Sequence, residues 1–300
     1  MPERPWRVAV LDSGIGPLPQ SARVVGARRF ADEGDQVLEL PPIEDPIGHG
    51  TAVASIIAST GRPVELVIAQ VLNERARCTA ATFAAAIVWA LGQRAELLHC
   101  SLGLPHDRAV LRTAIAAATG AGVLVVAAAP ARGATTYPAA YRGVIRATGD
   151  ARCDGEQISF LASCPSTGDR PREHETQPLH VQGCTPPPKG EAVPFSEALL
   201  RPPSEVASQN RAFSRNHAGP GRSPDPAFHT TAAADFGACP VHRDPSGKVS
   251  RGASMGAAHL SRYVVTHVAA GLAAGQVYET LVRRASFDGP ERHHPDAIQR

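Results

Sequence analysis

The 300-residue sequence predicts an α/β fold with a mostly parallel central sheet that is covered by helices on both faces. Up to residue 150, short apolar runs rich in β-branched residues alternate with Ala-rich helical stretches. Strands separated by helices of this length pair in parallel and are buried on both faces. Apolar residues make up 43% of the chain, which is enough for a sizeable core.

Taken in order, the elements of this part of the chain follow from their apolar patterns. Five apolar runs predict strands, at residues 7–12, 64–72, 96–103, 123–129 and 143–148. Helices are expected between them, at residues 49–60, 79–95 and 107–120. Chemistry collects at the carboxyl ends of the strands in such sheets. Asp12, Ser101 and Ala129 fall at or beside these ends.

The character of the sequence changes after residue 163. Residues 165–234 hold 12 of the 27 prolines and too little apolar surface to offset the entropy of ordering them. We therefore expect a Pro-rich, mostly disordered insertion over 164–234, with one short helix near 197–200. Helices return at 252–271 and 276–284. Residues 1–163 and 235–285 are expected to form one discontinuous domain, and 286–300 a polar tail.

Composition excludes several classes of function. Thirty basic residues against 28 acidic ones give a net charge of +2, which argues against a nucleic-acid or membrane-surface partner. No apolar run approaches the roughly 20 residues that cross a bilayer. The first strand begins by Val8 and leaves no room for a cleavable leader, so we expect a cytoplasmic protein. The six cysteines have no metal-like spacing, and we expect reduced thiols, no metal and no cofactor.

Three glycine-flanked segments carry the candidate catalytic residues. They are "VAVLDSGIG" with Asp12, "GHGTAVASII" with His49 and "GASMGAAH" with Ser254. Taken singly, each has an ordinary structural explanation: a capped turn, a helix start and a helix N-cap. Together they are the parts of a nucleophilic relay, in which a histidine takes the serine proton and a carboxylate orients the histidine. The second loop that an aspartic protease needs is missing, because no other D-[ST]-G occurs.

With their chain order of Asp, His, Ser, these motifs resemble those of subtilisin-like serine proteases (subtilases, peptidase family S8). The resemblance covers residues 7–163 and 234–272. It implies a three-layer subtilisin-like fold in which Asp12 orients the base, His49 is the general base and Ser254 is the nucleophile. The expected reaction is endopeptidase cleavage of a polypeptide substrate.

The resemblance also implies where a substrate binds. "HCSLG" is similar to the family's substrate-binding edge, where an extended peptide adds as a strand beside Ser101, Leu102 and Gly103. "GVLVVAAA" is similar to the strand behind the specificity pocket and ends at Ala129. Ala129, at the end of this strand, and Ala131, in the segment that follows it, are likewise expected to be substrate-binding residues.

Departures from the family pattern predict a slow enzyme. Subtilases follow this strand with Gly-Asn, but Pro130 and Ala131 stand here, and no asparagine occurs from 120 to 150. In subtilisin itself, loss of that oxyanion donor costs about 10²–10³ in rate. A hydroxyl from Thr135 or Thr136 is one alternative donor. The serine motif also departs, with Ala253 for the usual threonine and Ala258 for the usual proline.

The substrate expected from these features is one specific precursor protein. Only eleven residues precede Asp12, so we expect no prodomain, which suits limited processing more than bulk digestion. "ATGDARC" and "DFGACP" are similar to the compact subtilases that mature the cross-linked subunit of quinohemoprotein amine dehydrogenase. Two alternatives stay open. The protein is either an enzyme or an inactive scaffold that binds a peptide, and the insertion is either inert or a lid or docking arm near the cleft that selects the substrate.

Overall fold

The computed structural model describes residues 4–18, 22–34, 36–162 and 234–290. The expected insertion, its short helix near 197–200 and residues 291–300 of the expected tail lie outside the described residues, apart from Ala234 at the end of the insertion. Cys164 and Cys184 also lie outside them. The other four cysteines, Cys78, Cys100, Cys153 and Cys239, are free.

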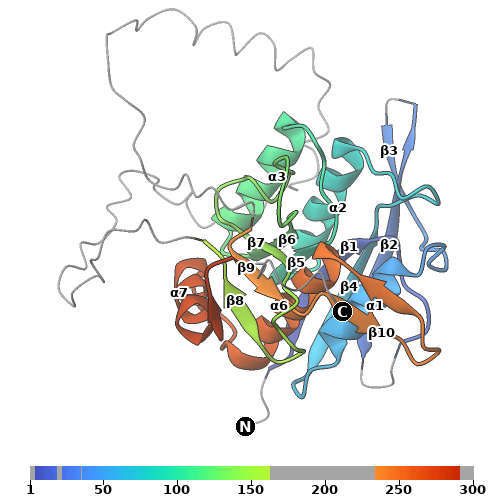
Figure 1. The fold of residues 1–300 in the computed structure, drawn as a ribbon. Helices are drawn as coiled ribbons and strands as arrows, with labels where there is room; N and C mark the ends of the chain where they lie inside the picture. Colours follow the sequence, from blue (N-terminus) through green and yellow to red (C-terminus); the bar gives the residue numbers. More distant parts are fainter. Residues whose placement is uncertain (1–3, 19–21, 35, 163–233, 291–300) are drawn as a thin grey trace, which may run out of the picture. The chain divides into compact units, whose positions relative to one another are not determined.

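A ten-stranded, mostly parallel sheet runs through the described part of the chain, which confirms the predicted fold class (Figure 1). Its strand order is β12-β8-β9-β7-β6-β5-β1-β4-β2-β3. Only the β2–β3 and β8–β9 pairs are antiparallel. The strands are β1 (Trp6–Asp12), β2 (Arg23–Glu33), β3 (Gln36–Leu40), β4 (Val64–Gln70), β5 (Leu97–Cys100), β6 (Leu124–Ala128), β7 (Val144–Gly149), β8 (Ile158–Phe160), β9 (Phe236–Ala238) and β12 (Phe287–Asp288). A separate hairpin joins β10 (Val241–Arg243) to β11 (Val249–Arg251).

Helices pack on both faces of the sheet. One face is covered by α1 (His49–Ala58), α6 (Ala253–His267) and α7 (Ala274–Arg284), and the other by α2 (Ala80–Gly92) and α3 (Ala109–Gly120). None of these helices has the length and apolar character to span a bilayer. The five helices predicted outside the insertion are present, with ends that differ from the expected ones by a few residues.

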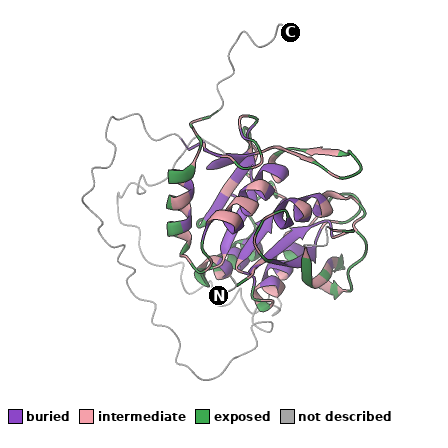
Figure 2. Cartoon of the chain, turned by 90° about the horizontal axis from the view of Figure 1, so that it is seen from below, coloured by how far each residue is buried: buried purple, intermediate pink, exposed green. Residues whose placement is uncertain are grey.

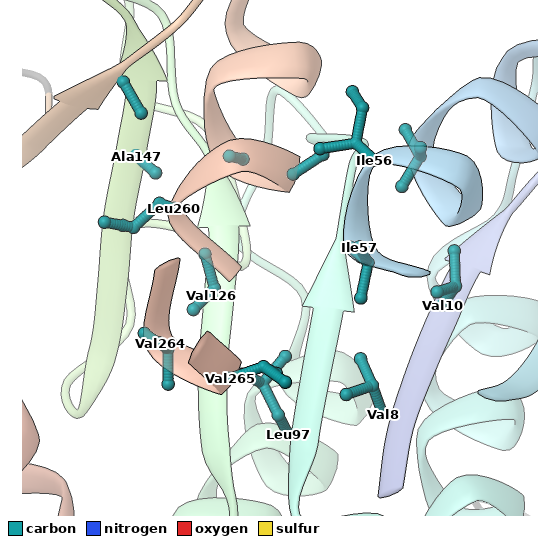
Figure 3. Close-up of a cluster of buried hydrophobic side chains, with 14 of the residues drawn as sticks. Val8, Val10, Ile56, Ile57, Leu97, Val126, Ala147, Leu260, Val264 and Val265 are labelled. Atoms are coloured by element: carbon teal, nitrogen blue, oxygen red, sulfur yellow. The ribbon is translucent and has the colours of Figure 1, made fainter. Parts of the chain in front are cut away.

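The alternation of side chains along β1 assigns each residue to one of two cores. Val8 and Val10 face α1 and α6, whereas Ala9 and Leu11 face α2 and α3, as the two-residue period of a strand requires. Figure 3 shows the first core, with side chains of the central strands packed against those of α1 and α6. In the central strands, every residue of β4, β5 and β6 is buried, and so is every residue of β1 except Arg7 (Figure 2). Each fully buried Val, Leu or Ile contributes about 1.5–3 kcal/mol.

The sheet differs from the sequence-based expectation in several parts, and neither β8 nor β9 was predicted. The β2–β3 hairpin was not predicted, and β5 ends at Cys100, so residues 101–103 lie beyond the strand. The start of the expected polar tail is part of the sheet, because Phe287 and Asp288 pair in parallel with β8. The backbone N–H groups of Ser286 and Gly289 donate to β8 carbonyls on either side of this pair.

The two ends of the expected insertion meet in the sheet. In the β8–β9 pair, Phe160 lies opposite Phe236, and the N–H of Leu161 donates to the carbonyl of Asp235 at 2.8 Å. The described residues on either side of the expected insertion therefore lie next to each other in the sheet.

Candidate active site

The three candidate catalytic residues come from the ends of three elements. Asp12 is the last residue of β1, His49 is the first residue of α1, and Ser254 is the second residue of α6. Both helices pack on the same face of the sheet. Residues far apart in the sequence are thus brought to one region.

Asp12 and His49 are in direct contact. Nδ1 of His49 lies 2.9 Å from each carboxylate oxygen of Asp12. Asp12 is fully buried, whereas the His49 side chain is 30% exposed, so the imidazole has one side in the protein and one accessible from outside. A carboxylate in this position fixes the ring orientation and places the proton on Nδ1, which leaves Nε2 free to act as a base.

Two further donors hold the Asp12 carboxylate. The N–H of Ser13 donates to Oδ1 at 2.6 Å, and the hydroxyl of Ser101 donates to Oδ2. Buried carboxylates need such partners, because an unpaired charge in the interior is costly. Ser101 therefore positions Asp12, a role that the sequence did not predict for it.

Asp45 fixes the loop that carries His49. Its carboxylate accepts hydrogen bonds from the N–H groups of Ile47, Gly48 and Thr51 and from the Thr51 hydroxyl, at 2.7–3.1 Å. Gly48 has φ +77°, a left-handed conformation that favours glycine. Asp45 thus satisfies free N–H groups at the start of α1, in the manner of a helix cap.

The pKa of His49 lies above the ordinary histidine value. Burial lowers the pKa, but the hydrogen bond and charge of Asp12, together with the charge of Asp45, outweigh burial. For Asp45, burial raises the pKa, and the hydrogen bonds from Thr51 and its neighbours more than reverse this, so its pKa is lowered. Asp45 therefore stays ionised when His49 titrates.

The small residues beside His49 and Ser254 permit close approach of the helices to the sheet. A Cβ on Gly50 would lie 2.3 Å from the carbonyl oxygen of Gly14, and one on Gly256 would lie 2.1 Å from that of Thr148. Neither contact is sterically allowed. The glycines of the two motifs thus have a packing reason, in addition to clearing space around the reactive side chains.

Ser254 is linked to Asp12 through Ser101. Its hydroxyl donates to the backbone carbonyl of Ser101 at 2.8 Å, while the Ser101 side chain donates to Asp12. The backbone N–H of Ser254 lies in the first turn of α6, where N–H groups have no acceptor within the helix. This N–H group is therefore suited to stabilise an oxyanion.

The predicted substrate-binding residues lie at the ends of β5 and β6. Ser101 is buried, Leu102 is half-buried and Gly103 is exposed, and the next residue, Leu104, forms a bridge with Tyr137. Ala129 is buried and its N–H donates to the carbonyl of Ala147, whereas Ala131 is exposed in the bend that follows.

The two candidate replacement donors differ in their surroundings. Thr135 is exposed, and Oγ1 of Thr136 is buried without a hydrogen-bond partner among the described residues. A Cβ on Gly103 would lie 2.8 Å from Cβ of Thr136. The Thr136 side chain therefore packs against the predicted substrate-binding edge.

A second histidine is buried behind the site. His99 in β5 is completely buried, with Nδ1 2.9 Å from Oγ of Ser261 and Nε2 without a partner among the described residues. Burial lowers the pKa of His99 to about 4, so the ring is neutral at ordinary pH. No three His, Cys, Asp or Glu side chains of the described segments gather as metal ligands.

Sequence reasoning missed Asp45 and the double role of Ser101. An acidic residue just ahead of a predicted helix is a recognised start signal, so Asp45 could have been found. The contacts of Ser101 depend on how β5, β1 and α6 meet, which no local pattern reveals.

The fold and these side chains define a class of protein: a three-layer α/β structure with an aspartate at the end of a central strand and a histidine and a serine at the starts of two helices. The sequence pattern of the subtilase family (Peptidase_S8) matches residues 5–270, and the chain belongs to that family.

Several proteases are similar to this chain. A thermostable alkaline protease of Halalkalibacterium halodurans is 32% identical over 170 residues, which are 53% of this chain and 45% of that protein. Subtilisin BL of Lederbergia lenta is 33% identical over 165 residues, 51% of this chain and 58% of the relative. An intracellular serine protease of Paenibacillus polymyxa is 32% identical over 157 residues, 46% and 48% respectively. The chain spans about half the length of these relatives.

Proposed function

We propose that the protein is a serine endopeptidase with Ser254 as nucleophile, His49 as general base and Asp12 as the orienting acid. The observation that carries the proposal is the contact of His49 Nδ1 with both oxygens of the buried Asp12 carboxylate, at 2.9 Å. Membership of the subtilase family and the proteases among the relatives support the same activity.

The reaction follows from this arrangement. His49 Nε2 takes the proton of the Ser254 hydroxyl as its oxygen attacks the substrate carbonyl carbon, and Asp12 stabilises the imidazolium that forms. His49 then gives the proton to the leaving amine, the peptide bond breaks, and an acyl ester remains on Ser254. Water, deprotonated by His49, hydrolyses the ester and restores the serine.

The resting serine must move before it attacks. A hydroxyl has one proton, and in this structure it is donated to the Ser101 carbonyl. Rotation about the Cα–Cβ bond of Ser254 would redirect the hydroxyl toward His49. A bound peptide whose N–H takes over the Ser101 carbonyl would favour this rotation.

The peptide is proposed to lie along Ser101, Leu102 and Gly103 as an added strand, with Ala129 and Ala131 on the opposite side. Residues 101–103 follow the end of β5 and precede the Leu104–Tyr137 bridge. The absence of asparagine at Ala131 leaves the Ser254 N–H as the main oxyanion donor, which supports a slow enzyme.

Limited processing of one precursor protein suits a slow subtilase better than bulk digestion. We further propose kinship with the compact subtilases that mature the cross-linked subunit of quinohemoprotein amine dehydrogenase, on the segments "ATGDARC" and "DFGACP". The competing function is a catalytically inactive fold that holds a peptide. It is favoured by the same missing asparagine.

One experiment separates the two functions. The protein and its Ser254→Ala variant are incubated with a mixture of unfolded polypeptides, and the products are identified by mass spectrometry. An endopeptidase yields new termini with the wild type and none with the variant. Binding by both proteins without any cleavage would favour the scaffold.

The role of the insertion is tested by replacing residues 166–233 with a short Gly-Ser linker. Its flanks already meet, because Leu161 bonds to Asp235, and loop-closure entropy changes slowly with length. We expect the free energy of unfolding to change by no more than about 1–2 kcal/mol. A docking arm predicts weaker cleavage of a protein substrate with unchanged cleavage of small esters, and an inert insertion predicts no change in either.

A further inference from the structure

The β10–β11 hairpin brings a concentrated positive charge to the catalytic region. Residues 241–251 contain three basic side chains, Arg243, Lys248 and Arg251, against one acid, Asp244. The net charge of this short hairpin is therefore as large as the +2 of the whole chain. All three basic residues are exposed.

The hairpin is firmly attached beside the nucleophile. The N–H of Gly252 donates to the carbonyl of Pro240 at 2.9 Å and closes the base of the hairpin, two residues before Ser254. His259 of α6 contacts the carbonyl of Val241 through Nε2 at 3.2 Å. Movements of the hairpin relative to α6 are thereby restrained.

The tip of the hairpin reaches the other catalytic element. Nζ of Lys248 lies 3.4 Å from the position that a Cβ on Gly48 would occupy, and Gly48 directly precedes His49. The hairpin thus extends from the Ser254 segment to the start of α1.

The acids near Lys248 are occupied by other bonds. The carboxylate of Asp244 accepts from the Ser246 hydroxyl and from the Lys248 backbone N–H, which shapes the turn. Asp45 is bound by the donors at the start of α1. Among the described residues, the ammonium of Lys248 forms no ion pair; it is exposed, its charge acts on Asp244, and it can also attract a negative charge on a ligand.

The position of the leaving amine identifies the half of the substrate that lies near the positively charged hairpin. His49 gives its proton to the leaving amine, so the segment that follows the scissile bond must run past His49. The segment before the bond lies along residues 101–103. We propose that the β10–β11 hairpin, through Lys248 and with support from Arg251, selects substrates with acidic residues immediately after the scissile bond. This inference rests on the proposed endopeptidase function.

The test uses three fluorogenic peptides that differ only in Glu, Gln or Lys at the first two positions after the cleavage site. Wild type, Lys248→Gln and Lys248→Glu are compared with Arg283→Gln. Arg283 is an exposed residue of α7, which packs over β8, and it serves as a matched change of charge.

We expect wild type to prefer the Glu peptide over the Gln peptide by about two- to fivefold in kcat/KM, the size of an exposed ion pair. The preference should shrink in about 1 M salt, because such pairs are screened. Lys248→Gln should reduce it, Lys248→Glu should invert it toward the Lys peptide, and Arg283→Gln should leave it unchanged.

Equal preferences in wild type and Lys248→Glu would overturn the inference while leaving the proposed function intact, since the peptides are still cut. If no peptide is cut by any form, the proposed function fails, and dissociation constants on Ser254→Ala then decide the inference. If Ser254→Ala binds the Glu peptide more tightly than the Lys peptide, and the double variant Ser254→Ala/Lys248→Glu shows the opposite order, the hairpin selects acidic peptides as proposed. Equal dissociation constants refute the inference.

Discussion

The backbone carbonyl of Ser101 accepts a hydrogen bond from the Ser254 hydroxyl, at 2.8 Å, and the Ser101 hydroxyl donates a hydrogen bond to Asp12. One residue therefore contacts both the nucleophile and the orienting acid of the proposed relay. The side chain and the backbone of Ser101 can be tested separately, because substitution removes only the side-chain bond.

Replacing Ser101 with alanine should weaken catalysis without unfolding the protein. The variant loses a hydrogen bond to a buried carboxylate, which contributes about 1.5–3 kcal/mol, so we expect at least a tenfold slower reaction of Ser254. The rate constant for labelling by a fluorophosphonate measures this. Ser59→Ala, which removes a hydroxyl bond at the far end of α1, is the control and should react normally. Equal rates for Ser101→Ala and wild type would exclude the positioning role.

The acid limb of the pH–rate profile should lie above the ordinary histidine value of 6.5, because the pKa of His49 is raised. His49 acts as a base only when neutral, so activity rises as pH passes through this pKa. Asp45→Asn removes one negative charge and should move the acid limb to lower pH.

The same variant should lose about 0.5–1.5 kcal/mol of stability, because the amide nitrogen that replaces one carboxylate oxygen cannot accept the hydrogen bonds which that oxygen accepts. Glu44→Gln changes the charge of the neighbouring residue and serves as the control. An acid limb that stays in place in Asp45→Asn would show that the Asp45 charge does not act on His49.

Ala131→Asn should raise kcat if the oxyanion lacks a side-chain donor. The gain reaches about 10²–10³ when the new amide points at the oxyanion, the value known for this position in subtilisin, with KM little changed. Ala134→Asn places the same side chain on an exposed position of the same loop and should have no effect. An unchanged kcat in Ala131→Asn would mean that another group, such as the Thr136 hydroxyl, fills the role or that Pro130 turns the loop away.

Acid should destabilise the protein through His99. In the folded protein burial lowers its pKa to about 4, whereas the unfolded chain has a value near 6.5. The unfolded form therefore takes up the proton first, and stability is lost as pH falls from about 6.5 to 4. This difference amounts to about 3 kcal/mol.

Urea titrations at pH 7, 5.5 and 4 measure that loss. His99→Asn keeps a polar partner for Ser261 and does not titrate, so its stability should fall by about 3 kcal/mol less over this range. Parallel losses in both proteins would assign the acid sensitivity to other groups.

The sequence predicts the central strands and long helices because their apolar patterns are strong. Val8, Val10 and Leu97 lie in buried strands and pack in one core, so these positions must be apolar. The β2–β3 hairpin escaped prediction because β2 carries exposed, charged residues and pairs with the central sheet only through β4. Its partner, β3, lies at the sheet edge, where little burial constrains the sequence.

For the candidate site, motif order identified Asp12, His49 and Ser254, while local patterns could not identify what holds them. The bond from Ser101 to Asp12 joins residues 89 positions apart. The approach of Lys248 to Gly48 likewise depends on the packing of a hairpin that has few apolar residues. Such contacts arise only when the sheet and both helices are assembled.

The central question is whether Ser254 is a nucleophile activated by His49. The protein is treated with an active-site fluorophosphonate, and the modified residue is located by mass spectrometry of peptides. We expect one adduct, on Ser254, that forms faster above the pKa of His49. It should be absent in Ser254→Ala and strongly reduced in His49→Ala. A folded wild-type protein that stays unlabelled at every pH, or an adduct on another residue, would contradict this expectation.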